Sequence, residues 1–197
     1  MFPNKYLALV LARKGSKRLK NKNILKLGGN SLTSITLKKL QKVSYLFSDI
    51  LVSSDCPRIK KITKDHNLLF LQRPKKLSGD KISSEKSALH ALNYYIKNYK
   101  KIDYIALFQV TSPFRKNSTI YKAIKLSKKY PTKQIVAVDK KSLKPNGLIY
   151  ITPNYFLKKK YSFSEKNFIP LKIQSKKESL DIDTVKDFRL AKKYFKN

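Results

Sequence analysis

Five short apolar runs mark the chain, and each is rich in valine, isoleucine, leucine or phenylalanine. None alternates strictly between apolar and polar positions, which favours strands of a parallel sheet that is covered on both faces. The pattern predicts buried strands at residues 6–11, 50–52, 68–71, 104–108 and 134–138. A further strand is predicted at residues 147–151.

Between these runs, apolar residues recur at intervals of three and four, the spacing that gives a helix one apolar face. The predicted helices cover about 31–46, 57–66 and 84–96, a segment after a cap at Asn117-Ser118, and a segment after Asp183-Thr184. Alternating strands and helices indicate an α/β fold, with a doubly wound, mainly parallel sheet and helices on both faces. We expect residues 1–197 to form a single domain.

Polar motifs follow the first four predicted strands. Ligands of doubly wound sheets bind beyond the carboxyl ends of the strands, so motifs at these positions indicate a common site. The motifs are residues 12–23, Ser53–Asp55, Arg73 and Gln109–Arg115.

The loop after the first strand combines small and cationic residues. Gly15 lets the backbone approach a ligand, Ser16 can donate to phosphate oxygens, and Arg13 and Lys22 can neutralise them. The spacing is neither a Walker A loop nor a Gly-x-Gly-x-x-Gly motif, since Gly15 stands alone. The loop favours a polyphosphate ligand, and the alternative is a solvated basic loop.

Asp181 and Asp183 flank Ile182 at what we expect to be a strand end. Extended backbone would point both carboxylates to one side and Ile182 into the core. Such carboxylates repel each other unless a cation lies between them, and Mg²⁺ takes carboxylates together with substrate phosphates. The pair is therefore a candidate metal site in a chain with only 12 acidic residues. The alternative is that Asp183 caps the following helix.

Six motifs, in order along nearly the whole chain, resemble the acylneuraminate (CMP-sialic acid) cytidylyltransferase family. They are residues 12–23, Val52–Asp55, Arg73-Pro74 with Leu77, Asp80 and Ser83-Ser84, Gln109–Arg115, Asn146–Ile151 and Asp181–Phe188. The resemblance implies a Rossmann-like nucleotidyltransferase that transfers CMP from CTP to a nonulosonic sugar acid and releases pyrophosphate. Nucleotidyl transfer to another acid, such as a deoxyoctulosonate, is the alternative within this class.

The resemblance also implies roles for individual residues. The residues that it implies bind the nucleotide are Arg13, Gly15, Ser16, Lys22, Asn23, Arg73 and Ser84. Asn23 and Arg73 would read cytosine, while Arg13 and Lys22 would stabilise the leaving pyrophosphate. Asp181 and Asp183 would hold Mg²⁺. Residues for the sugar acid are Gln109, Thr111, Ser112 and Asn146.

Three of these assignments have structural alternatives. Ser84 could cap its helix, Thr111-Ser112-Pro113 could be a turn that begins a helix, and Asn146-Gly147 could be a tight turn before a strand. Each alternative needs no ligand.

The chain departs from the family between Val138 and Asn146. Relatives carry a longer segment there, which supplies part of the sugar pocket and an arm that crosses to a partner subunit, whereas this chain has only residues 139–145. We expect an intact nucleotide half and a shortened sugar half, with residues 153–178 as a possible substitute wall. A homodimer built through this segment would be weakened. The alternative to an active enzyme is an inactive relative of the family.

The formal net charge is +33, with 45 lysines and arginines, a balance that suggests nucleic-acid binding. Only six of these residues are arginines, which is the residue favoured for base and phosphate contacts, and the lysines are spread over the chain. We interpret the charge as compositional bias and expect no nucleic-acid partner. A polyanion-binding protein without enzyme activity is the alternative.

The sequence favours a cytoplasmic protein without a membrane partner. No apolar run approaches the roughly 18 to 20 residues of a membrane span, and no signal-peptide pattern is visible. Cys56 is the single cysteine, so an internal disulfide is excluded.

Overall fold

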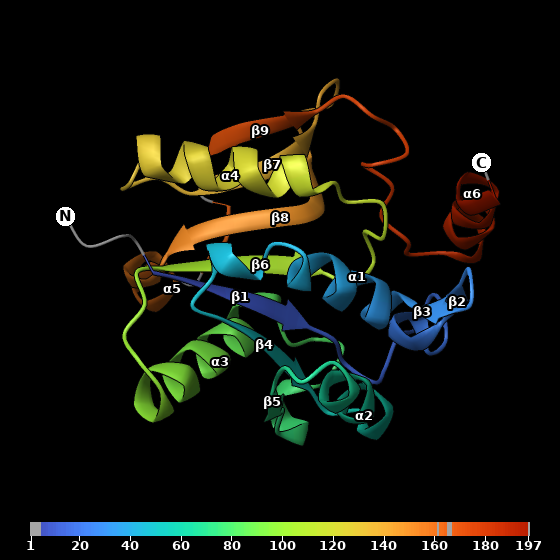
Figure 1. Ribbon diagram of the computed structural model, residues 1–197, viewed down its shortest axis with the longest axis horizontal. Coiled ribbons are helices and arrows are strands. Elements are labelled where there is room, and N and C mark those ends of the chain that lie inside the picture. Colours follow the sequence, from blue (N-terminus) through green and yellow to red (C-terminus); the bar gives the residue numbers. More distant parts are fainter. Residues whose placement is uncertain (1–4, 161, 165–166, 197) are drawn as a thin grey trace.

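The computed structural model describes residues 5–160, 162–164 and 167–196 (Figure 1). Its centre is a sheet of seven strands in the order β5-β4-β1-β6-β8-β7-β9. The strands are β1 Tyr6–Leu11, β4 Asp49–Ser54, β5 Leu69–Gln72, β6 Tyr104–Gln109, β7 Ile135–Asp139, β8 Pro145–Pro153 and β9 Ile169–Ile173. A separate hairpin pairs β2 Lys26–Leu27 with β3 Asn30–Ser31.

The first four strands of the large sheet, β5, β4, β1 and β6, are parallel to one another. Strand β8 is antiparallel to both β6 and β7, and β9 is parallel to β7. In the register, Leu11 lies opposite Ser53 on one side and Gln109 on the other, and Ser54 lies opposite Gln72. The four parallel strands therefore end at the same level, and the motifs that follow them begin at one edge.

Helices cover both faces of the sheet. They are α1 Leu32–Gln41, α2 Pro57–Asp65, α3 Ser84–Asn98, α4 Asn117–Lys129, α5 Asn154–Lys160 and α6 Val185–Lys196, with 3-10 turns η1 Lys22–Ile24, η2 Ser44–Leu46 and η3 Lys75–Leu77. Alternate residues of β1 face opposite sides: Ala8 and Val10 share a core with α1, α2 and α4, whereas Leu7 and Leu9 pack with α3 and α5. The doubly wound, mainly parallel fold is confirmed.

The predicted helix at 31–46 is shorter than expected. Ser31 caps α1 by accepting a hydrogen bond from the Ser34 N–H, but α1 ends at Gln41 and only the 3-10 turn η2 follows. Strand β9 and helix α5 were not predicted. Their segments, at 169–173 and 154–160, are short and rich in lysine or proline, so they carry little apolar periodicity.

The structure differs from two predictions: a strand end at residues 181–183 and a turn at Asn146-Gly147. Residues 181–183 form an irregular segment after β9 and not the end of a strand, although Ile182 is buried as expected. Asn146 and Gly147 lie inside β8 and do not form a turn before it.

The short connection between β7 and β8 joins neighbouring strands. Its turn closes where the Asp139 N–H donates to the Lys144 carbonyl over 2.9 Å. The Asp139 carboxylate accepts from the N–H groups of Lys141 and Ser142 at 3.0 and 2.9 Å. The expectation that both flanking strands persist is confirmed, because a hairpin needs no longer link.

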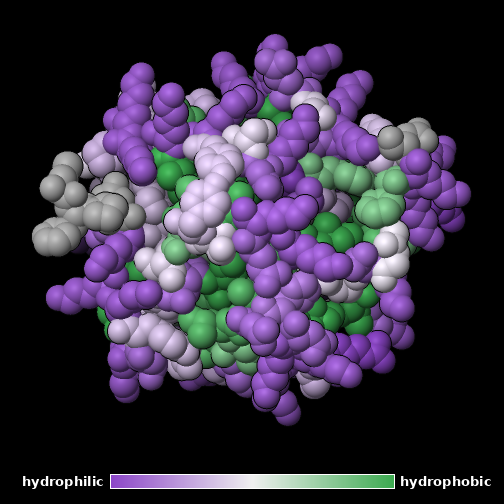
Figure 2. All heavy atoms as spheres, in the orientation of Figure 1, coloured by the Kyte–Doolittle hydropathy of each residue, from purple (hydrophilic) through white to green (hydrophobic). Residues whose placement is uncertain are grey.

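Two observations concern the nucleic-acid and membrane partners considered above: the distribution of hydrophilic side chains and the character of the helices. Hydrophilic side chains cover most of the face shown in Figure 2 and do not gather into one stripe. Among the residues that the structure describes, no helix combines the length and the apolar character that a bilayer crossing requires.

Helix α6 lies beyond the carboxyl end of β1, beside the β2–β3 hairpin (Figure 1). Its start is a reciprocal cap: the Thr184 Oγ1 accepts from the Asp187 N–H at 3.3 Å, and the Asp187 carboxylate accepts from the N–H groups of Asp183 and Thr184 at 3.1 and 2.8 Å. Thr184 and Asp187 therefore cap α6, which leaves the Asp183 carboxylate free for other partners.

We expect Thr184→Ala to lower the free energy of unfolding by about 1 kcal/mol, because it removes one side of this cap. Urea denaturation at neutral pH measures the change. Thr132→Ala, at an exposed turn, is the control and should be close to neutral. Equal stabilities of the two variants would contradict the assignment of the cap.

Candidate functional site

A cleft opens at the carboxyl edge of the parallel strands. Every residue that the sequence predicted to bind nucleotide lines it, namely Arg13, Gly15, Ser16, Lys22, Asn23, Arg73 and Ser84. Gln109 and Thr111 from the predicted sugar set line it as well. Apolar side chains of Leu11, Leu77, Ile82 and Leu107 complete the walls. Residues distant in sequence thus meet where the strand register places them.

The loop after β1 is held by the neighbouring strand. The Ala12 N–H donates to the Ser53 carbonyl at 3.1 Å, and the Lys14 N–H donates to the Asp55 carboxylate at 2.7 Å. Within the loop, the Asn23 amide donates to the Arg13 carbonyl at 2.9 Å. These bonds fix the path of the backbone from 12 to 23.

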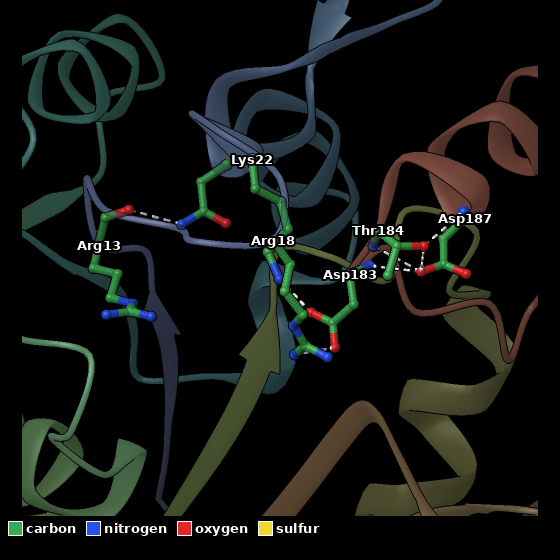
Figure 3. A network of polar contacts seen from close by, with 7 residues as sticks. Arg13, Arg18, Lys22, Asp183, Thr184 and Asp187 are labelled. Atoms are coloured by element: carbon green, nitrogen blue, oxygen red, sulfur yellow. Dashed lines mark hydrogen bonds and ion pairs between the residues drawn. The ribbon is translucent and has the colours of Figure 1, made fainter.

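The cations of this loop are paired with two carboxylates. Arg13 and Lys17 contact Asp80 at 2.5 and 3.2 Å. Arg18 and Lys22 contact Asp183 at 2.7 and 2.5 Å, and Figure 3 shows these three residues. Hydrogen bonds from Arg13 and Lys17 lower the pKa of Asp80. Lys22 is only 16% exposed, so a freely solvated loop does not describe it.

Arg73 is buried beneath the cleft. Its Nη2 donates to the Ser53 carbonyl at 2.6 Å and its Nε to the Ser53 Oγ at 3.3 Å. Burial lowers the pKa of Arg73 to about 10, with Asp55 opposing this shift. The guanidinium therefore stays protonated at neutral pH and keeps a fixed orientation.

Ser84 lines the cleft and does not cap α3. The cap is Ser83, whose hydroxyl accepts from the Lys86 N–H at 3.3 Å. Likewise, no helix begins at Thr111-Ser112-Pro113, because α4 starts only at Asn117. Ser84 is therefore not a helix cap, and Thr111-Ser112-Pro113 is not the start of a helix.

The sugar residues divide into two groups. Gln109 and Thr111 face the cleft, whereas Ser112 is buried and Asn146 contacts Ser179 and Leu148. Gly147, with φ at +74°, lies against Gln109, because a Cβ there would be 2.4 Å from the Gln109 Oε1. Asn146 therefore lies next to the residue that supports Gln109, outside the cleft wall.

The carboxylate pair lies beside two cleft residues. Asp181 is half-buried and accepts a hydrogen bond from the Thr111 side chain, and the Ile182 N–H donates to the Thr111 carbonyl at 2.9 Å. Burial raises the pKa of Asp181. Asp183 contacts Lys22, as described above.

Asp181 fits a magnesium ion as the structure stands, whereas Asp183 would first have to exchange its contacts with Arg18 and Lys22 for it. The Asp181 Oδ1 is buried without a hydrogen-bond partner among the described residues, which is the state that a cation would satisfy. In residues 5–196, with the gaps given above, no cluster of three or more aspartates, glutamates, histidines or cysteines could hold a metal by itself. Mg²⁺ needs only one or two carboxylates when phosphates complete its coordination.

Sequence reasoning gave no role to several residues that shape the site. Asp55, Asp80 and Arg115 belong to the motifs, and the scarcity of acidic residues could have singled out the two aspartates. Arg18 was hidden among many cations. Glu178 gave no signal, because the groups that it binds lie about 60 residues away, at Lys116 and Thr119.

Comparisons with known proteins identify the family of this chain. A family model described as cytidylyltransferase matches residues 7–193. The N-acylneuraminate cytidylyltransferase of Escherichia coli is 32% identical, over 95% of this chain and 51% of that protein. The CMP-N,N'-diacetyllegionaminic acid synthase of Legionella pneumophila is 29% identical, over 95% of this chain and 94% of that protein. The chain thus spans about half the length of the first relative and nearly all of the second.

Solved structures show the same fold. A CMP:2-keto-3-deoxy-manno-octonic acid synthetase in complex with CTP superposes with a TM-score of 0.79 at 12% identity, over 98% of this chain and 99% of that one. A cytidylyltransferase from Leptospira borgpetersenii gives 0.71 at 18% identity, over 96% and 85%. The alignment with the E. coli relative is 219 positions long, more than the 197 residues of this chain, so that relative has additional residues within the matched region. The chain belongs to the cytidylyltransferase family, and its resemblance to the acylneuraminate cytidylyltransferases is confirmed.

Proposed function

We propose that this protein transfers CMP from CTP to a nonulosonic sugar acid and releases pyrophosphate. The observation that carries the proposal is the convergence of all the predicted nucleotide residues on one cleft beside a carboxylate pair. The names of both relatives above describe cytidylyl transfer to, or a CMP conjugate of, an acid of this class.

In this proposal, Arg13, Ser16 and Lys22 bind the triphosphate, and Asn23 and Arg73 contact the cytosine. Asn23 and Arg73 suit that role because each is already fixed by a hydrogen bond to backbone, at the Arg13 and Ser53 carbonyls. A donor that is already oriented loses little entropy when it binds the base.

The reaction is an in-line displacement. A hydroxyl oxygen of the acid bonds to the α-phosphorus, the bond from that phosphorus to the bridging oxygen of the β-phosphate breaks, and pyrophosphate leaves. Such transfers depend mainly on positioning and on charge neutralisation. Mg²⁺ at Asp181 and Asp183 would supply charge neutralisation and make the attacking hydroxyl more acidic.

Lys22 lies between the nucleotide cleft and the carboxylate pair. It lines the cleft and at the same time contacts Asp183 at 2.5 Å. Its ammonium group can therefore turn from the carboxylate to the leaving pyrophosphate without a change of backbone. Arg13, released from Asp80, would neutralise the same leaving group.

The acceptor half is the part in which we expect differences from relatives. Gln109 and Thr111 form its wall, and the β7–β8 turn at 140–144 is too short to add a long arm. A smaller or different acid, including a deoxyoctulosonate, is therefore the second candidate acceptor. We expect any homodimer built through this connection to be weakened for the same reason.

The direct test is pyrophosphate release by the purified protein with Mg²⁺. CTP, UTP, ATP and GTP are each combined with a panel of nonulosonic and deoxyoctulosonic acids. We expect release with CTP and at least one acid, and little with the purine nucleotides, because the cleft fixes Asn23 and Arg73 for a small base. Equal release with all four nucleotides would contradict the assigned base contacts.

We expect Asp183→Asn to reduce turnover by at least about 100-fold, a loss of several kcal/mol of transition-state stabilisation. The fold should persist, because the Arg18–Asp183 pair is exposed and contributes little to stability, and the Lys22 ammonium can still donate to the amide oxygen of the variant. Asp65→Asn, exposed on α2, is the control. Wild-type turnover of Asp183→Asn at limiting Mg²⁺ would contradict the metal assignment.

We expect Gly147→Ala to raise the KM for the sugar acid at least about tenfold, because the new Cβ would displace the Gln109 side chain. CTP affinity should change by less than about twofold. Gly29→Ala is a matched control: its φ of +79° brings the same backbone strain of about 1–2 kcal/mol, with no atom within 4 Å of the new Cβ. Equal KM values for the two variants would show that Gln109 does not contact the acid.

A further inference from the structure

Arg115 joins two strands at the point where they diverge. The pairing of β6 with β8 ends at Leu107 and Tyr150. Beyond it, the Arg115 Nη2 donates to the Gln109 carbonyl at 2.8 Å and its Nε donates to the Leu148 carbonyl at 2.6 Å. The guanidinium therefore satisfies carbonyls on both strands and holds them at a set separation.

One of these carbonyls belongs to a residue of the acceptor wall, and the other lies one residue from its support. Gln109 forms that wall, and Leu148 follows Gly147, the residue against which the Gln109 side chain rests. Arg115 itself is fully buried and does not line the cleft. A shift of its side chain would move the two sides of the Gln109–Gly147 contact relative to each other.

Residues 178–183, which include the candidate metal ligands, are held at both ends by residues that lie close to Arg115 in the chain. At one end, the buried Glu178 accepts from the Lys116 N–H at 3.1 Å and from the Thr119 hydroxyl, so it caps α4 in place of a local side chain. At the other end, Ile182 and Asp181 bond to Thr111. Burial lowers the pKa of Arg115 to about 9, while the charges of Glu178 and Asp181 oppose this shift.

Unpaired buried polar atoms concentrate in this region. Of the five such side-chain atoms among the described residues, three are the Ser112 Oγ, the Arg115 Nη1 and the Asp181 Oδ1. Stability alone does not favour this arrangement, because a buried charge with an unpaired donor costs free energy. Each such group calls for an explanation, and a role in the neighbouring site is one.

We propose that Arg115 is a positioning residue that sets the acceptor wall at Gln109 and the metal-side carboxylate Asp181 in one fixed relation. It contacts neither substrate nor metal and acts through the Gln109 carbonyl, the Leu148 carbonyl and the charge that it presents to the 178–183 segment. The inference rests on the proposed function, because it concerns the metal and acceptor of that same site.

Arg115→Lys tests the proposal, because it keeps the charge but cannot donate to both carbonyls in a fork. Three quantities are measured: CTP binding by calorimetry in EDTA, Mn²⁺ binding to the CTP complex by electron paramagnetic resonance, and the KM for the acid. We expect CTP affinity within twofold of wild type, Mn²⁺ affinity reduced about tenfold and KM raised about tenfold.

Tyr95→Phe is the matched control for a general loss of stability. It removes a buried hydrogen bond to Asp49, at the start of β4 and thus at the opposite edge of the sheet from the cleft. Both variants are compared at temperatures where each is fully folded. If Arg115→Lys changes only the thermal midpoint, as Tyr95→Phe should, Arg115 has a structural role alone and the proposal is overturned.

A second variant covers failure of Arg115→Lys to fold. Glu178→Gln keeps an acceptor for Lys116 and Thr119 and removes the charge that faces Arg115. We expect its Mn²⁺ affinity to fall about threefold with CTP affinity unchanged, and wild-type Mn²⁺ affinity would overturn the proposal. If Mn²⁺ binding requires Asp181 but changes in neither variant, this inference alone is overturned. If the wild type releases no pyrophosphate, the proposed function is overturned.

Discussion

The common level at which four parallel strands end is the constraint on which the site depends. Backbone hydrogen bonds between β5, β4, β1 and β6 fix that level, with Leu11 opposite both Ser53 and Gln109. A slip of one strand would carry its loop away from the others and turn its side chains to the other face. The loops therefore meet because the sheet is in register, and each needs only short-range contacts to reach the cleft.

Electrostatics adds a second constraint. In a chain with a net charge of +33, most cations have no carboxylate to pair with, yet Asp80 and Asp183 each bind two cations of the loop after β1. The loop is thereby ordered in advance by two carboxylates from other parts of the chain. A polyphosphate would replace these carboxylates by exchange, so that binding requires little additional ordering of the chain.

Much of the fold could be predicted from sequence, since buried parallel strands and amphipathic helices leave clear periodic signals. The first loop and the Asp181–Asp183 pair were identifiable because their residue types are unusual for this composition. Glu178 was not identifiable, because its role as the cap of α4 exists only when residues 116 and 178 are adjacent in space. The sequence equally could not show that Asn146 and Gly147 lie within β8, because Asn-Gly is a turn signal, and here the two residues lie where the register of β8 with β7 shifts.

The contact between Gly147 and Gln109 has a consequence for how the family can vary. Since a Cβ at position 147 would displace the long side chain at position 109, changes at the two positions are coupled. A relative with alanine or serine at 147 must move or shorten the residue at 109, whereas a shorter residue at 109 removes only the steric part of the requirement for glycine, because the positive φ at 147 remains. Covariation of these two positions across acylneuraminate-type sequences is therefore the expected record of this contact.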